Sequence, residues 1–198
     1  MGTLAIGSCT GALLAGCGPA GPLIHKPPKD LVLTVGELPY PGFVVEQGSP
    51  SAGVYSDRRA AAGNRDLLRK LESAGRITGY EADFTRSISP QQAVGPVVIE
   101  SSAATYRSAA GAATGLQVVV QQARGAGGVQ ISTGSLGDQA VGFTLQKQFN
   151  GTTYEAFVVA WRQKNVVAGI QIEGNAATLD VTYAITLAQL QQHQIAQA

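Results

Sequence analysis

The sequence predicts an α+β domain: a twisted, mostly antiparallel sheet with a C-terminal three-stranded meander, and helices packed on the sheet. Three stretches alternate apolar and polar residues as half-buried strands do; they are residues 141–149, 153–162 and 166–173. Three other stretches repeat apolar residues at helical spacing; they are residues 57–73, 101–123 and 175–194. The middle strand of the meander is apolar on both sides, so helices are expected on both faces of the sheet.

Two short turns determine the register expected for the meander. Asn150-Gly151 is the strongest short signal of a two-residue hairpin turn, and Lys164-Asn165 follows the second strand. A two-residue turn determines every facing pair of an antiparallel hairpin. The expected pairs are Leu145 with Ala156, Phe143 with Val158, Trp161 with Ala168, Val159 with Ile170, and Phe157 with Ile172.

The first and last helices are expected from apolar spacing and from residues that end helices. Residues 57–73 place three leucines on one face, with Gly63 weakening the middle and Gly75 ending the helix. The last helix is expected to start near Asn175 and to run to about Gln194. Both helices then present an apolar face to the sheet.

The second helix is expected to follow a serine cap. Ser101 or Ser102 is the expected cap, because a serine side chain can accept a hydrogen bond from the first turn. The helix is then expected to run to about Ala123, with Gly111 and Gly115 four residues apart. Glycines at that spacing allow close packing against a sheet.

Shorter extended segments precede and separate the helices. They are expected at residues 31–35, 42–46, 77–86 and 97–99. The glycine-rich stretch 124–137 follows a helix and precedes a strand. A phosphate-binding loop has the reverse order, so this stretch is expected to be a flexible connector.

The first residues of the chain read as an export signal. Their apolar stretch is shorter than the roughly 20 residues that span a bilayer and fits the core of a signal peptide. It ends in Leu14-Ala15-Gly16-Cys17, which resembles the lipobox of bacterial lipoproteins. The resemblance implies that a diacylglyceryl group is attached to the Cys17 thiol and that the chain is cleaved before it.

The domain boundaries follow from this motif. Residues 1–16 are expected to be the signal peptide, residues 17–41 a lipidated N-terminus and Pro/Gly-rich linker, and residues 42–198 one globular α+β domain. The segment before the apolar stretch carries no basic residue, although signal peptides normally open with positive charge. We therefore expect either that the true start lies upstream of Met1 or that export is inefficient.

Composition excludes several classes of function. The formal net charge is +1, from 14 basic and 13 acidic residues, so no nucleic-acid partner is expected. Both cysteines, Cys9 and Cys17, lie in the first segment, which leaves no disulfide or thiolate metal site in the domain. The two histidines, His25 and His193, are far apart in the sequence. No metal site, Ser-His-Asp triad or cofactor is expected.

The order of elements carries a second resemblance. A helix, two strands, a helix, three strands and a final helix follow one another, and Leu136-Gly137-Asp138 forms a turn before the meander. This arrangement resembles the PsbP-like domains of some actinobacterial lipoproteins and receptor-kinase sensor modules, over roughly Gly42 to the end of the chain. The resemblance implies a non-catalytic binding or assembly module.

The expected function is therefore a non-enzymatic binding, sensing or assembly module on the extracytoplasmic face of the cell membrane. Its expected partners are the membrane, through the lipid on Cys17, and an envelope protein or apolar ligand. One alternative is a carrier with an apolar groove; its candidate face is Phe157, Val159, Trp161 and Ile170. Another is an envelope enzyme that uses the carboxylates Glu81 and Asp83, which share one strand face.

Overall fold

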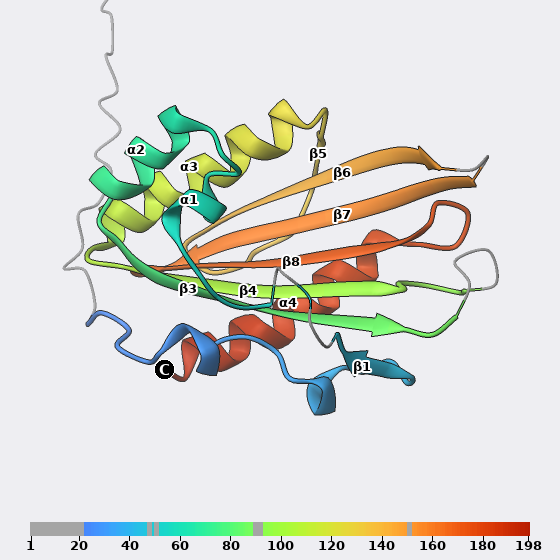
Figure 1. The fold of residues 1–198 in the computed structure, drawn as a ribbon. Coiled ribbons are helices and arrows are strands. Elements are labelled where there is room, and N and C mark those ends of the chain that lie inside the picture. Colours follow the sequence, from blue (N-terminus) through green and yellow to red (C-terminus); the bar gives the residue numbers. More distant parts are fainter. Residues whose placement is uncertain (1–21, 47–48, 50–51, 89–92, 150–151) are drawn as a thin grey trace, which may run out of the picture.

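A single antiparallel sheet organises the chain in the computed structural model, which describes residues 22–46, 49, 52–88, 93–149 and 152–198 (Figure 1). Seven strands follow the order β1-β3-β4-β8-β7-β6-β5, and β2 also pairs with β3. The strands are β1 Phe43–Val45, β2 Gly53–Tyr55, β3 Arg76–Arg86, β4 Val98–Tyr106, β5 Val129–Ile131, β6 Gln139–Phe149, β7 Thr152–Gln163 and β8 Val166–Asn175. The helices are α1 Asp57–Ala60, α2 Arg65–Ser73, α3 Ala109–Gly125 and α4 Val181–Ala196, with short 3-10 helices η1 Pro28–Asp30 and η2 Val35–Glu37. The predicted α+β class is confirmed.

The C-terminal meander is confirmed together with its register. All five facing pairs expected from the two turns are present: Leu145 with Ala156 and Phe143 with Val158 between β6 and β7, and Trp161 with Ala168, Val159 with Ile170 and Phe157 with Ile172 between β7 and β8. Asn150 and Gly151 themselves lie outside the described residues. Asp138 accepts hydrogen bonds from the Arg162 guanidinium (2.9 Å) and from the Lys164 backbone N–H (2.7 Å). The turn before the meander is thereby joined to the turn between β7 and β8.

Helices lie on both faces of the sheet, and they cover the two faces differently. α4 packs on one face, where Trp161, Val159 and Ile172 are fully buried. On the other face α2 and α3 pack on Ala104, Ala160 and Val167. Figure 1 shows α1, α2 and α3 gathered over one end of their face, so part of the sheet extends beyond them.

The start of the second helix was predicted wrongly. Residues 98–106 form β4, which pairs with β3 on one side and with β8 on the other. Ser108 caps α3, accepting a hydrogen bond from the Gly111 backbone N–H at 3.0 Å. Two neighbouring strands satisfy the backbone of β4, and this outweighs the capping preference of the earlier serines.

The first and last helices also differ from their predicted extents. Gly63, at φ 76°, and Ala62, at φ 48°, break residues 57–73 into α1 and α2. The Asn64 side chain then caps α2 by accepting from two backbone N–H groups. Asp180 caps the last helix, which therefore starts at Val181 and not near Asn175. A left-handed glycine and two side-chain caps thus set these boundaries.

Residues in the described stretch 22–41 pack against the sheet and α4. Leu31, Val32 and Leu33 are buried and form no strand. Ile24 is also buried, and Asn165 bonds both its N–H (2.7 Å) and its C=O (3.1 Å). The described part of the predicted linker is therefore attached to the domain. In the glycine-rich stretch, the short strand β5 pairs with β6.

Replacing Asn165 with alanine should destabilise the protein by about 2–4 kcal/mol, because it leaves buried backbone groups of Ile24 and Tyr106 without partners. Urea unfolding followed by the fluorescence of Trp161, the single tryptophan, measures this change. Asn175→Ala is the matched control, since Asn175 makes one exposed hydrogen bond to the Ala177 N–H. Equal stability losses in the two variants would contradict the anchoring role of Asn165.

Candidate functional site

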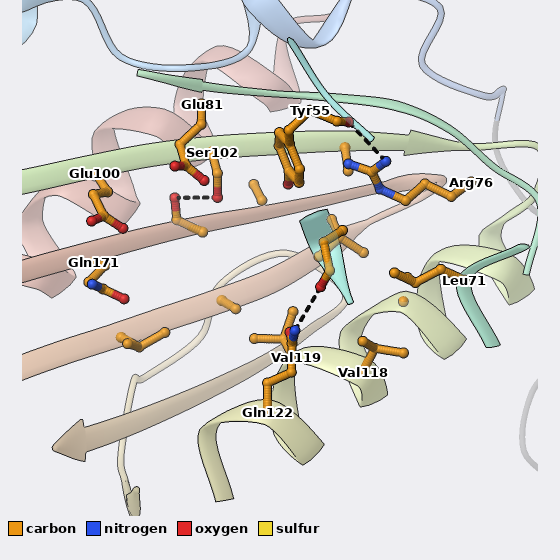
Figure 2. A pocket seen from close by; sticks show the side chains of 18 of the residues that line it. Tyr55, Leu71, Arg76, Glu81, Glu100, Ser102, Val118, Val119, Gln122 and Gln171 are labelled. Atoms are coloured by element: carbon orange, nitrogen blue, oxygen red, sulfur yellow. Dashed lines mark hydrogen bonds between the residues drawn. The ribbon is translucent and has the colours of Figure 1, made fainter. Parts of the chain in front are cut away.

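A pocket of about 240 Å³ lies between the sheet and the helices α1 to α3 (Figure 2). Strands β3, β4, β7 and β8 supply its floor, and α1 and α3 supply its roof. Its apolar walls include Leu71, Ala104, Val118, Val119, Val158, Ala160 and Val167. Its polar lining includes Tyr55, Arg59, Arg76, Glu81, Glu100, Ser102, Gln122 and Gln171.

The space in this pocket comes from small residues that the register aligns. Ser102 on β4 faces Gly169 on β8, and Gly169 faces Ala160 on β7. Facing side chains of neighbouring strands lie next to each other on one face of a sheet. Three neighbouring strands therefore present little side-chain volume at the same level, directly below α3.

A polar row runs beside this small-residue row. Asp83 on β3 faces Glu100 on β4, Glu100 faces Gln171 on β8, and Gln171 faces Val158 on β7. Glu81 lies on the same face of β3, where it faces Ser102. Figure 2 shows Glu81, Glu100 and Gln171 together at one end of the pocket. The pocket therefore has an apolar centre and an acidic end.

One polar contact of α1 joins the roof to the floor, and a second joins α1 to α3 within the roof. Arg59 forms a salt bridge with Glu81 at 2.7 Å, which joins α1 to β3. Gln122 on α3 donates a hydrogen bond to the Ala60 carbonyl at 2.7 Å. Gly115 lets α3 approach β4, because a Cβ there would overlap the Tyr106 hydroxyl. These contacts set the height of the pocket.

A buried arginine closes the end of the pocket that lies away from the acidic residues. The Arg76 side chain is 1% exposed and pairs with Asp57 at 2.8 Å. Its guanidinium carbon lies 4.5 Å from the centre of the Tyr55 ring, an attractive cation–π distance. Burial raises the pKa of Tyr55, and the nearby Arg76 charge opposes that rise. The positive charge of Arg76 at this end of the pocket is thus balanced by the carboxylate of Asp57.

Glu100 is the most perturbed carboxyl group of the pocket. Burial, and after it the neighbouring carboxylates Glu81, Asp83 and Glu173, raise its pKa to about 8 against the opposing charge of Arg59. Burial also raises the pKa of Glu81, while Arg59 lowers it. Arg59 pairs with Glu81, whereas the described residues provide no hydrogen bond or ion pair for Glu100.

The residues singled out from the sequence lie in three places. Glu81 lines the pocket, and Asp83 beside it is buried and accepts a hydrogen bond from Ser49. Phe157, Val159, Trp161 and Ile170 belong to the core cluster that α4 covers. Among these four, the pocket reaches only Ile170. The apolar ligand face around Trp161 therefore stays a prediction, and so does lipidation of Cys17, which lies outside the described residues.

Sequence reasoning missed Glu100, Gln171 and Arg59. Glu100 was overlooked because the second helix was expected to begin one residue later. The alternation of Ile99, Ser101 and Ala103 with Glu100, Ser102 and Ala104 was the available signal for a longer strand. With β4 assigned, Glu100 falls on the same face as Ser102.

The fold is similar to that of a solved extracellular domain. The extracellular domain of PknH from Mycobacterium tuberculosis superposes with a TM-score of 0.58 and 10% sequence identity, covering 86% of this chain and 95% of that one. No family model and no curated protein matches this chain. In the described part of the chain, every helix is too short or too polar to cross a membrane. At this identity, the comparison shows a common fold, and the resemblance to PsbP-like domains stays a prediction.

Gly115→Ala should destabilise the protein by about 1–3 kcal/mol, because the added methyl group overlaps the buried Tyr106 hydroxyl. Gly125→Ala is the control at the end of the same helix, where an added Cβ has no neighbour within 4 Å. It should stabilise the helix by up to about 1 kcal/mol. Thermal unfolding of both variants measures the difference; an unchanged Gly115→Ala protein would show that α3 can lift at no cost.

Glu100→Gln should stabilise the unliganded protein increasingly as the pH rises from 5 to 8. The folded-state pKa is raised to about 8, so the unfolded chain releases its proton first and wild-type stability falls across this window. Glutamine removes that loss because it is never charged. Urea unfolding at pH 5, 7 and 8.5 measures the gain, which should grow by about 1.4 kcal/mol for each pH unit and reach several kcal/mol at the highest pH. A gain that is constant with pH would contradict the raised pKa.

Proposed function

We propose that this chain is a binding or sensing module of the bacterial cell envelope, and that its pocket takes a small ligand. The pocket carries the proposal: apolar walls and a few converging polar groups, formed between two packed layers, are the usual features of a ligand site. Its volume of about 240 Å³ suits a small molecule. The similarity of the fold to an extracellular domain supports a location outside the cytoplasm.

The proposal includes a lipid tether on Cys17. The motif Leu14-Ala15-Gly16-Cys17 and the apolar stretch before it support the tether. In this proposal the module acts by binding and the lipid holds it at the cell membrane. The ligand or an envelope protein is then the partner that the module detects.

The same carboxylates support a second candidate function, an envelope enzyme. Glu81 lies in a pocket, and burial raises its pKa, as in a group suited to proton transfer. Asp83, the other predicted carboxylate, is buried and bonded to Ser49. The binding role is favoured because Glu81 is already paired with Arg59.

Blocking the pocket should abolish binding of a neutral probe. Val119 on α3 lines the pocket, whereas Gln117 on the same helix is exposed. In the full chain carrying Cys17→Ala, 1-hexanol should bind with a millimolar Kd, the affinity expected for so few atoms. In the wild-type pocket, 1-hexanol should change the backbone amide chemical shifts of the residues that line it. Val119→Phe should abolish these ligand-induced changes, and Gln117→Phe should leave them as they are. Ligand-induced changes that spread over other surfaces, or that persist in Val119→Phe, would contradict a ligand pocket.

The tether has a separate test. The full chain should fractionate with membranes when expressed in a bacterium that processes lipoproteins, and mass spectrometry should find diacylglyceryl on Cys17. Cys17→Ala should move the protein to the soluble fraction, because the thiol that carries the lipid is gone. Cys9→Ala is the matched control and should stay with the membrane. Membrane retention of Cys17→Ala would contradict the tether.

A further inference from the structure

We infer that the pocket selects a small organic cation, which carries an ammonium group on an apolar body. The carboxylate of Glu100 is the group that pairs with the ammonium. The inference rests on the proposed function, because it names the ligand class of the same pocket. Three features of the pocket support it: the imbalance of charge, the environment of Glu100 and the apolar walls.

Charge is unbalanced at one end of the pocket. The cations Arg59 and Arg76 are each matched by a carboxylate, through the pairs Arg59–Glu81 and Arg76–Asp57. Two further carboxyl groups, Glu100 and Glu173, lie around the acidic end. An excess of negative charge in a partly enclosed space attracts cations and disfavours anions.

Glu100 is the member of this group that is placed to contact a ligand. It lines the pocket and is neither buried completely nor exposed. Asp83 is 2% exposed and bonded to Ser49, and Glu173 accepts a hydrogen bond from Gln171 at 3.0 Å. Among the described residues, no side chain or backbone group forms a hydrogen bond or an ion pair with the Glu100 carboxyl. An ammonium group would supply the missing hydrogen bond and offset the repulsion among the carboxylates.

The walls indicate an organic cation. Beside Glu100 the pocket continues over Val158 and under Val118 and Val119. A bare metal ion would leave these apolar side chains without a function, since hard cations take oxygen ligands all round. In the described part of the chain, no three His, Cys, Asp or Glu side chains are grouped as metal ligands. A ligand with a charged head and an apolar body fills both parts of the pocket.

The direction of pH dependence follows from the charged groups around Glu100. Those that face it are Glu81 and Asp83 on β3, Glu173 on β8 and Arg59 on α1. Burial, followed by the three carboxylates, raises the Glu100 pKa to about 8. Below that pH the carboxyl must lose its proton before it can pair with an ammonium group. Affinity for an amine should therefore rise by about tenfold per pH unit up to pH 8 and then level off.

The test compares three probes of equal chain length: hexylamine, 1-hexanol and hexanoate. The full chain carrying Cys17→Ala is titrated by NMR at pH 6, 7 and 8.5. We expect hexylamine to bind at least about tenfold more tightly than 1-hexanol at pH 8.5, as a hydrogen bond to a charged group provides. Hexanoate should bind more weakly than 1-hexanol. The preference for hexylamine should shrink toward pH 6.

Glu100→Gln should remove the amine preference and its pH dependence, while 1-hexanol still binds. Asp30→Asn is the charge-matched control, because Asp30 is exposed in η1, away from the pocket. It should leave the preference intact. Equal binding of hexylamine and 1-hexanol, or a preference that survives in Glu100→Gln, would overturn the inference and leave the ligand pocket standing. Failure of all three probes would overturn the proposed function itself.

Discussion

The alternation of side chains along the three strands of the meander is the constraint on which the rest of the structure depends. Because β7 is apolar on both sides, each face of the sheet must be covered. α4 covers one face over the buried Trp161, Val159 and Ile172. The other face is covered by α1, α2 and α3, and the pocket lies between these helices and the sheet.

The pocket face shows how small residues and charges are combined. The row of Ser102, Gly169 and Ala160 leaves space, and the adjacent Asp83 and Glu100 place negative charge at its edge. Grouping carboxylates around the partly buried Glu100 costs stability, since Glu81, Asp83 and Glu173 all raise the pKa of Glu100. A ligand that binds Glu100 would recover part of that cost. This coupling would link the pocket and its acidic end to the proposed preference for a cation.

The sequence was most informative where backbone pairing and side-chain alternation agree. The meander register followed from two turns, and all five facing pairs were confirmed. Prediction was wrong at residues 98–106, because the serines that cap helices well are equally able to occupy a strand that is paired on both sides. That error concealed Glu100. Arg59 could not be placed at the site from sequence, because its position depends on the break at Gly63.

The attachment of the N-terminal segment has a consequence for the geometry at the membrane. Ile24 is fixed by Asn165, and Leu31 by a hydrogen bond from Gln191 at 2.9 Å. Only seven Cα–Cα steps separate Ile24 from Cys17, and a fully extended chain of that length spans at most about 25 Å. A domain of this size has a radius of gyration of about 16 Å. With a lipid on Cys17, the folded domain would be confined to a layer next to the membrane that is about as thick as the domain itself. It would then encounter compounds concentrated at the bilayer surface before those in bulk solution.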